Sequence, residues 1–217
     1  MSEADHYPAT DRTTPTRHAD RAHYDVETVH AILDSVLVGH LAHAIDGVPE
    51  VLPLLFARID DRIYLHQSTG GRLARACAAQ PVPAAFSVAA VDGLVLARSW
   101  MNHSLNYRSV VVHGLLTAVT DPDERWAALE QTVNRVVAGR ADASRPPDRQ
   151  ELAATAVLAL DLAEVSAKIR SGPVQDEPED LALAWWAGVV DVNQTFGPVH
   201  SASEPDTPAA VRTLLSY

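Results

Sequence analysis

The sequence predicts a mainly β fold with peripheral helices, an α+β arrangement in which antiparallel strands form a closed or partly closed barrel. Several short apolar runs are separated by turn-forming pairs. An Ala-rich helical segment at 71–79 interrupts these runs, and a long helical segment follows at 121–138. This order is not the regular strand–helix alternation of a doubly wound parallel sheet. An antiparallel barrel with outer helices accounts for it better.

The first helix is predicted to begin after Asp25. Apolar residues then recur at helical spacing, Asp25 is a suitable N-cap, and Gly39 fits the C-terminal stop. Three strand-like runs come next, at 40–45, 50–59 and 62–67. Two pairs supply turns between these runs, Asp46-Gly47 and Asp60-Asp61.

The middle of the chain predicts a hairpin and a long strand. Apolar runs at 83–91 and 93–99 flank Asp92-Gly93, a dipeptide that favours a two-residue hairpin turn. The run at 107–119 predicts one long strand.

The second half of the chain begins with a helix at 121–138. Asp121 is its N-cap, Pro122 its first helical residue, and Glu124 occupies the capping-box position. A charged, proline-containing connector, one or two strands, and a short helix leading into a last strand follow at 139–150, 155–171 and 178–190.

Length and composition predict one substantial domain. The chain has 217 residues, and we expect a flexible arm at 1–22, a domain at 23–196 and a loosely packed tail at 197–217. A formal net charge of −11 argues against a non-specific nucleic-acid binder. No apolar run approaches the roughly 18 residues that span a bilayer. The polar N-terminus has no apolar signal core, so we expect a cytoplasmic protein without nucleic-acid or membrane partners.

The stretch IYLHQSTGGRLARACAAQP, residues 63–81, combines a strand, a turn of small residues and a helix start. Strand alternation places Tyr64, His66 and Ser68 on one face. Backbone amides at a helix start favour anions, and Arg72 would add a charge-assisted contact, so this turn is a candidate phosphate site. The alternative is an ordinary corner whose hydroxyls cap the helix and whose arginines are solvated.

Other clusters are less specific. Polar residues crowd 102–108 ahead of a strand, which suggests a binding loop, although a solvated loop is the simpler interpretation. Trp185 and Trp186 suit either core packing or the covering of a partner subunit or an aromatic cofactor. The ten histidines lack metal-ligand spacing, and Cys77 stands alone, so we expect no metal site.

Six segments in order resemble the pyridoxamine 5'-phosphate oxidase-related FMN-binding split-barrel proteins, and among them the branch that includes the nitroimidazole-resistance flavoproteins. The segments are LDSVLVGHLAHAIDGVPEVLP, IYLHQSTGGRLAR, DGLVLARS, HSLNYRSVVVHG, SAKIRSGPVQDEPED and WWAGVV. They extend from about Tyr24 to Gly188. The resemblance implies a homodimer of split β-barrels, with FMN in a groove at the dimer interface.

The resemblance also implies which residues contact the cofactor. Leu65 and His66 would border the flavin. Ser68, Thr69 and Arg72 would hold its phosphate. The remaining implied contacts are Pro53, Leu54, Leu55, Tyr107, Arg108, Ser109 and Trp186, with Trp185 as the alternative to Trp186.

The implied activity is FMN-dependent oxidation or reduction of a small nitroaromatic, quinone or conjugated carbonyl substrate, with chemistry supplied by the flavin. His66 is the candidate catalytic residue, as a proton donor or substrate contact, because its unperturbed pKa lies near neutrality. A purely structural hydrogen bond is the alternative role.

The oxidases' paired basic residues are replaced by VLPLLF, and their C-terminal arginine-histidine signature is not recognisable, which argues against vitamin B6 phosphate as substrate. The alternative function is a non-catalytic flavin- or haem-binding protein of the same fold.

Overall fold

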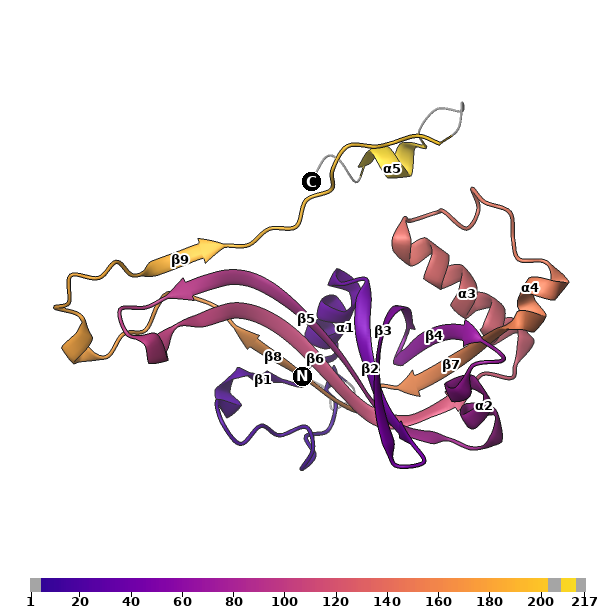
Figure 1. Ribbon diagram of the computed structural model, residues 1–217, viewed down its shortest axis with the longest axis horizontal. Coiled ribbons are helices and arrows are strands. Elements are labelled where there is room, and N and C mark those ends of the chain that lie inside the picture. The colour runs from indigo at the N-terminus through magenta and orange to yellow at the C-terminus, as the bar shows by residue number, and fades with distance from the viewer. Residues whose placement is uncertain (1–4, 203–207, 214–217) are drawn as a thin grey trace.

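The computed structural model describes residues 5–202 and 208–213, which contain a mainly antiparallel sheet with helices at its periphery (Figure 1). The strands are β1 (Ala22–His23), β2 (Val38–Ile45), β3 (Val48–Ile59), β4 (Arg62–Ser68), β5 (Val82–Leu96), β6 (Ser104–Ala118), β7 (Thr155–Asp161), β8 (Glu164–Arg170) and β9 (Gly188–Asp191). The helices are α1 (Val26–Ser35), α2 (Arg72–Ala79), α3 (Pro122–Val136), α4 (Arg149–Ala154) and α5 (Ala209–Thr213), with short 3-10 turns at Ala19–Arg21, Trp100–Asn102 and Pro178–Asp180. No helix within the described residues is long and apolar enough to cross a membrane.

Six strands close into a barrel in the order β6-β7-β4-β3-β2-β5, because β5 pairs again with β6. Along its length, the long strand β6 pairs first with one strand and then with another. It pairs with β8 from Tyr107 to His113 and then with β7 at Thr117 and Ala118. The barrel is therefore split along one edge. The prediction of an antiparallel barrel with peripheral helices is confirmed.

The centre of the barrel is packed around two phenylalanines. The rings of Phe56 and Phe86 meet edge to face, with their centroids 4.9 Å apart. Gly39 lies in β2 and not at the end of a helix, so that prediction was wrong, because α1 already ends at Ser35. A Cβ atom on Gly39 would overlap the Phe86 ring. The glycine is needed where the backbone of β2 crosses this ring.

The predicted hairpin at Asp92-Gly93 was also wrong. β5 continues through this dipeptide, and the pairing with β6 shifts by one residue between Val91 and Gly93, which is a β-bulge. Arg108 binds both carboxylate oxygens of Asp92, at 2.9 Å each, and the Asp92 carbonyl accepts a hydrogen bond from Val192. These tertiary bonds stabilise the extra residue within a strand.

The helix caps are confirmed with one change. Asp25 accepts a hydrogen bond from the Thr28 amide, and Asp121 accepts one from the Glu124 amide, both at 2.8 Å. The full capping box lies at the start of α4, where Asp148 and Glu151 cap each other's backbone amides. This box falls in the predicted connector at 139–150, the end of which is helical.

The segment expected to be a flexible arm makes defined contacts where it is described. The Tyr7 hydroxyl donates to Asp61 at 2.5 Å, and the Thr10 hydroxyl donates to Glu164 at 2.9 Å. β1 pairs with β8. These contacts hold the segment along the outer edge of the sheet, and residues 1–4 lie outside the described range.

The chain after residue 171 runs along β5 and then leaves the barrel. β9 pairs with β5 from Gly93 to Leu96, and the following segment extends above the body of the molecule to α5 (Figure 1). Of the tail expected at 197–217, the described residues are exposed apart from the half-buried Val211, and residues 203–207 and 214–217 lie outside the described range.

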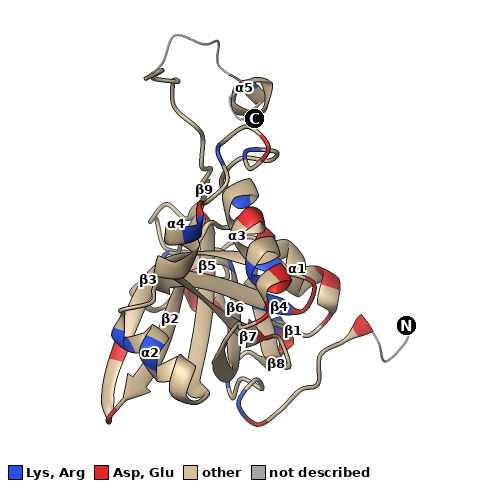
Figure 2. Cartoon of the chain, turned by 90° about the vertical axis from the view of Figure 1, so that its right-hand side faces the viewer, with Lys and Arg blue, Asp and Glu red and all other residues tan. Residues whose placement is uncertain are grey.

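The outer face of β2 and its neighbours carries few charges. Alternation places His40 and Ala42 outward, opposite Pro53 and Val51 of β3. β2 contains no Lys, Arg, Asp or Glu, and β5 contains only Asp92, so both strands are almost wholly tan in Figure 2. In a chain of net charge −11, this face is suited to an apolar ligand or a partner subunit.

Substituting Gly39→Ala tests the packing around Phe86. We expect a loss of about 1–3 kcal/mol in the free energy of unfolding, because the new methyl group forces the ring or the strand to move. Denaturant unfolding measures this loss. Gly197→Ala is the matched control, since a Cβ there has no neighbour within 4 Å. Equal stability of the two variants would contradict the packing described here.

Candidate functional site

Strand β4 has two faces in different environments. Ile63 and Leu65 belong to the barrel core and are fully buried. Tyr64 faces the other way and packs in a separate cluster with Ala128 of α3. His66 lies on the same face as Tyr64, as the alternation predicts, and lines a pocket with residues of α3. Leu65 was expected at the flavin, but its side chain lies inside the barrel.

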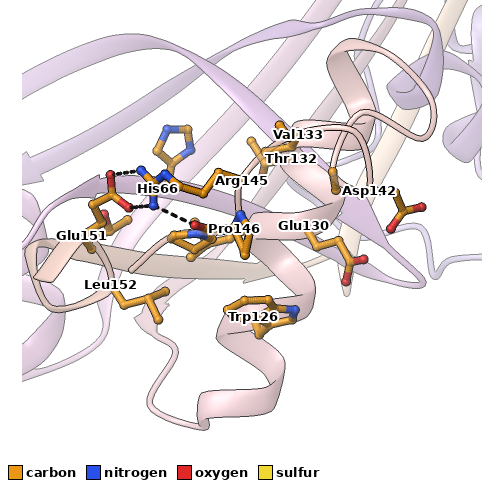
Figure 3. A pocket seen from close by; sticks show the side chains of 15 residues that line it. His66, Trp126, Glu130, Thr132, Val133, Asp142, Arg145, Pro146, Glu151 and Leu152 are labelled. Atoms are coloured by element: carbon orange, nitrogen blue, oxygen red, sulfur yellow. Dashed lines mark hydrogen bonds and ion pairs between the residues drawn. The ribbon is translucent and has the colours of Figure 1, made fainter. Parts of the chain in front are cut away.

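A pocket of about 590 Å³ opens above His66, between α3, the connector and α4 (Figure 3). Trp126, Leu129 and Val133 of α3 form one apolar wall. Apolar residues of the connector and α4 form much of the other, among them Pro146, Pro147 and Leu152. The described residues offer the His66 side chain no hydrogen-bond or ion-pair partner. Its imidazole is therefore available to a ligand in the pocket.

The first turn of α3 is attached to the sheet by polar contacts. Glu124 accepts a hydrogen bond from the Tyr64 hydroxyl at 2.8 Å and pairs with Arg62 at 2.5 Å. Burial and the bond to Glu124 raise the pKa of Tyr64. Arg125 donates to the carbonyls of Leu152 and Thr155, at 3.0 and 2.9 Å. These bonds fix the start of α3 to β4, α4 and β7.

The last turn of α3 is attached to α1. Arg135 donates to the carbonyl oxygens of Leu33, Asp34 and Val36, at 2.5–2.6 Å, which are carbonyls at the C-terminal end of α1. Its guanidinium also lies 5.6 Å from the centre of the Phe56 ring. Burial lowers the pKa of Arg135. The helix is thus held at both ends by polar bonds.

Between these ends, α3 leaves an apolar face uncovered. Trp126 is 43% exposed and Val133 is 39% exposed, although both point into the pocket with Leu129. Residues at positions i, i+3 and i+7 share one helix face. An apolar face of α3 above the His66 imidazole, which has no partner, is suited to a large planar cofactor. Such a cofactor could also form a bond to the imidazole nitrogen.

The sequence prediction missed this pocket. The stripe of Trp126, Leu129 and Val133 was visible in the sequence, but the same helix also buries Ala128 and Thr132 against the sheet. The capping residues Asp121, Pro122 and Glu124 were enough to predict a helix. A second stripe, on a different face, was the signal for a pocket.

The rim of the pocket carries an ion pair between the connector and α4. Arg145 donates to Glu151 through both terminal nitrogens, at 2.7 and 3.0 Å. It also donates to the Pro146 carbonyl at 2.9 Å. The bond to Arg145, together with the Asp148 amide, lowers the pKa of Glu151 to about 2.

The turn after β4, the predicted phosphate site, uses much of its own hydrogen-bonding capacity. Thr69 donates to the Ala154 carbonyl through its amide at 2.9 Å and its hydroxyl at 3.2 Å. The Gly71 amide donates to the Ser68 carbonyl, and the Gly70 amide to the Ser68 hydroxyl. An anion would therefore bind to the amides of the first turn of α2, which lack partners within that helix.

Arg72 is engaged with the β2–β3 hairpin. Its guanidinium donates to Glu50 at 2.9 Å, to the Ile45 carbonyl at 3.1 Å and to Asp46 at 3.3 Å. Figure 2 shows basic residues of α2 beside this acidic hairpin. A phosphate at the turn would have to compete with these two carboxylates for Arg72.

The remaining predicted contacts lie on different parts of the molecule. Pro53 lies on the outer face of β3, whereas Leu54 packs against the core. Arg108 is bound to Asp92 and Ser35, and the Ser109 hydroxyl donates to the Lys168 carbonyl at 3.3 Å. The others are Leu55 on β3, Tyr107 on β6 and Trp186, which is 66% exposed in the segment before β9.

The polar cluster at 102–108 is mostly strand. β6 begins at Ser104, and the cluster's polar groups bind neighbouring protein segments. Asn106 donates to the Gly172 carbonyl at 3.1 Å, and His103 contacts the Ser99 carbonyl at 2.8 Å. In the described part of the chain, no group of three or more His, Cys, Asp or Glu residues is arranged to hold a metal ion.

Comparisons with known proteins identify a family. The profile of a family described as "Pyridoxamine 5'-phosphate oxidase" matches residues 25–169. No curated protein matches the chain. The flavocytochrome Anf3 from Azotobacter vinelandii shares 38% identity with a TM-score of 0.84, over 92% of this chain and 93% of its own.

Two further solved structures extend this comparison. An FAD and heme binding protein from Mycobacterium smegmatis shares 34% identity with a TM-score of 0.83, over 90% of this chain and 97% of its own. A 5-nitroimidazole antibiotic resistance protein from Bacteroides thetaiotaomicron, described as putative, shares 15% identity with a TM-score of 0.56, over 68% of this chain and 86% of its own. The latter shows a shared fold alone.

The low pKa of Glu151 gives a testable pH dependence. A carboxyl whose pKa is lowered in the folded state contributes stability above its unfolded pKa, and this contribution is lost as the pH falls from about 4.3 towards the folded value. We expect the pair with Arg145 to persist at pH 5 and to break only as the pH approaches 2. Carbon NMR titration of the Glu151 carboxyl measures this directly, and Arg145→Gln should raise its pKa. An unchanged pKa in that variant would contradict the pairing.

Proposed function

Because the chain belongs to the pyridoxamine 5'-phosphate oxidase family of flavin-binding split barrels, we propose that it is a redox protein that binds both a flavin and a haem. The pocket under α3, with an unpartnered imidazole and an uncovered apolar wall, is the observation that carries this proposal. Two relatives above 30% identity support it, since one is a flavocytochrome and the other binds FAD and haem.

The residues around the pocket fit a haem. Imidazole is a common protein ligand of haem iron, and His66 offers its ring from the floor of the pocket. Trp126, Leu129 and Val133 would cover an apolar macrocycle and keep water from it. When bound, haem supplies one-electron chemistry. His66 would bind the haem iron, and this role would replace its expected one as a proton donor or substrate contact.

The flavin site is assigned to the turn after β4 and the outer face of the sheet. Ser68, Thr69 and Arg72 are proposed to hold the flavin phosphate, with Arg72 giving up part of its contact with Glu50 and Asp46. Pro53 and Leu55 would lie against the ring. FMN and FAD both carry the phosphate that this turn would bind, and chromatography of the flavin released from the purified protein separates the two.

A homodimer is proposed to complete the flavin site. The outer face of β2 and β5 is nearly free of charge, and Trp185 and Trp186 are 70% and 66% exposed. Exposed tandem indoles, here in the segment that leads into β9 beside the end of β5, are suited to an interface. A second copy would bury them and form the other wall of the flavin groove.

A flavin-dependent oxidoreductase without haem is the second candidate. The family description and the phosphate-type turn favour it. Such an enzyme would reduce a small nitroaromatic, quinone or conjugated carbonyl, and the flavin would do the chemistry. An absorbance spectrum of the purified protein separates the candidates, because a bound haem gives an intense Soret band, whereas flavin alone gives its two weaker bands without one.

Substituting His66→Ala tests the haem site. Titration with hemin should give a Soret band with the native protein, and we expect the affinity to fall by about ten-fold or more in the variant, because the bond from the imidazole to the iron would be worth more than about 1.4 kcal/mol. His103→Ala is the matched control, since His103 does not line the pocket. A His66→Ala protein with native affinity and an unchanged spectrum would contradict the proposal.

Substituting Arg72→Ala tests the flavin site. We expect FMN affinity to fall about ten-fold, because a charge-assisted bond contributes roughly 1.5–3 kcal/mol, while riboflavin affinity stays the same. Glu50→Gln should strengthen FMN binding, since it frees Arg72. Quenching of flavin fluorescence measures both, and Arg75→Ala is the control on the same helix. Equal losses for FMN and riboflavin would rule out a phosphate role for Arg72.

A further inference from the structure

We propose that Arg145 is the carboxylate-binding group of the pocket under α3, and that Glu151 occupies this group in competition with an acidic ligand. The inference rests on the proposed haem function, since a haem carries two propionate groups. It assigns to the Arg145–Glu151 pair a role in selecting the cofactor, in addition to fastening the connector to α4.

Among the described residues that line the pocket, the charges make Arg145 the candidate for this role. Of the residues that line the pocket, Arg145 is the single Lys or Arg, whereas Glu130, Asp142 and Glu151 are acidic. Figure 3 shows His66, Arg145 and Glu151 on one side of the pocket and the other two carboxylates on the opposite side. A ligand with carboxylates therefore finds one favourable position, beside His66.

The exposure of the Arg145–Glu151 ion pair allows a ligand carboxylate to replace Glu151. The side chain of Arg145 is 66% exposed and that of Glu151 is 48% exposed. Exposed ion pairs contribute little to stability, so a ligand carboxylate can replace Glu151. A buried pair would resist such replacement, because separating it leaves an uncompensated charge.

Both partners keep other contacts after an exchange. Arg145 donates to the Pro146 carbonyl, which holds its guanidinium at the rim. Glu151 accepts a hydrogen bond from the Asp148 amide at 2.8 Å and remains part of the capping box of α4. The exchange thus leaves the connector and α4 in place. The Glu151 carboxylate moves away from Arg145, and a carboxylate of the ligand takes its place.

The alternative role for the pair is purely structural, a clasp that closes the connector onto α4. The two roles differ in what they predict for ligand chemistry. A clasp would affect every ligand of the pocket equally. A carboxylate-binding group would affect only ligands that carry a free carboxylate.

The test compares hemin with its dimethyl ester, which has the same macrocycle and iron but no free carboxylate. Soret titrations give the affinity of the native protein, Arg145→Gln and Arg149→Gln. We expect the native protein to bind hemin about ten-fold more tightly than the ester, as a charge-assisted bond implies. Arg145→Gln should bind both with the affinity of the ester. Arg149→Gln should match the native protein, because Arg149 lies on α4 outside the pocket lining.

Glu151→Gln provides a second test that does not remove the arginine. Gln at this position keeps the capping box, and Arg145 loses its competitor. We expect this variant to bind hemin more tightly than the native protein does and to bind the ester unchanged.

Two results would overturn the inference while leaving the haem pocket in place. One is native hemin affinity in Arg145→Gln. The other is an equal loss for hemin and ester in that variant, which would show a structural clasp. A Soret band with neither compound would instead overturn the proposed haem function itself.

Discussion

The alternation of side chains along β4 is the constraint on which the rest of this site depends. A strand that closes a barrel must direct every second side chain inward, and Ile63 and Leu65 fill the core. The residues between them, Tyr64 and His66, must then face outward. The fold covers the first with α3 and leaves the second at the floor of a pocket.

The attachment of α3 explains why this pocket stays open. Most surface helices are held by an apolar face packed on the core. Here Glu124, Arg125 and Arg135 bind the two ends of the helix to strands and backbone carbonyls. Together with the burial of Ala128 and Thr132 on the sheet, these bonds hold the helix, so its other apolar face need not be covered, and Trp126 and Val133 remain exposed. The polar ends thus preserve an apolar wall for a ligand.

Local patterns in the sequence predicted most elements, but not the features that tertiary contacts decide. Asp92-Gly93 has the composition of a hairpin turn, yet Arg108 and Val192 hold it inside a strand. Gly39 follows a helix, yet the Phe86 ring determines its place. Periodicity placed His66 on the correct face of β4. It did not reveal the partners of Arg72 or the pocket under α3, because both depend on segments distant in the sequence.

We propose that the two cofactors occupy different places around β4, with haem under α3 and flavin at the turn and the outer face of the sheet. A crystal structure of the protein reconstituted with both cofactors tests this assignment most directly. We expect electron density for a porphyrin under α3, with iron bonded to the His66 imidazole, and for a flavin outside this pocket. A flavin in the pocket under α3, or a haem bound elsewhere with His66 unligated, would contradict it.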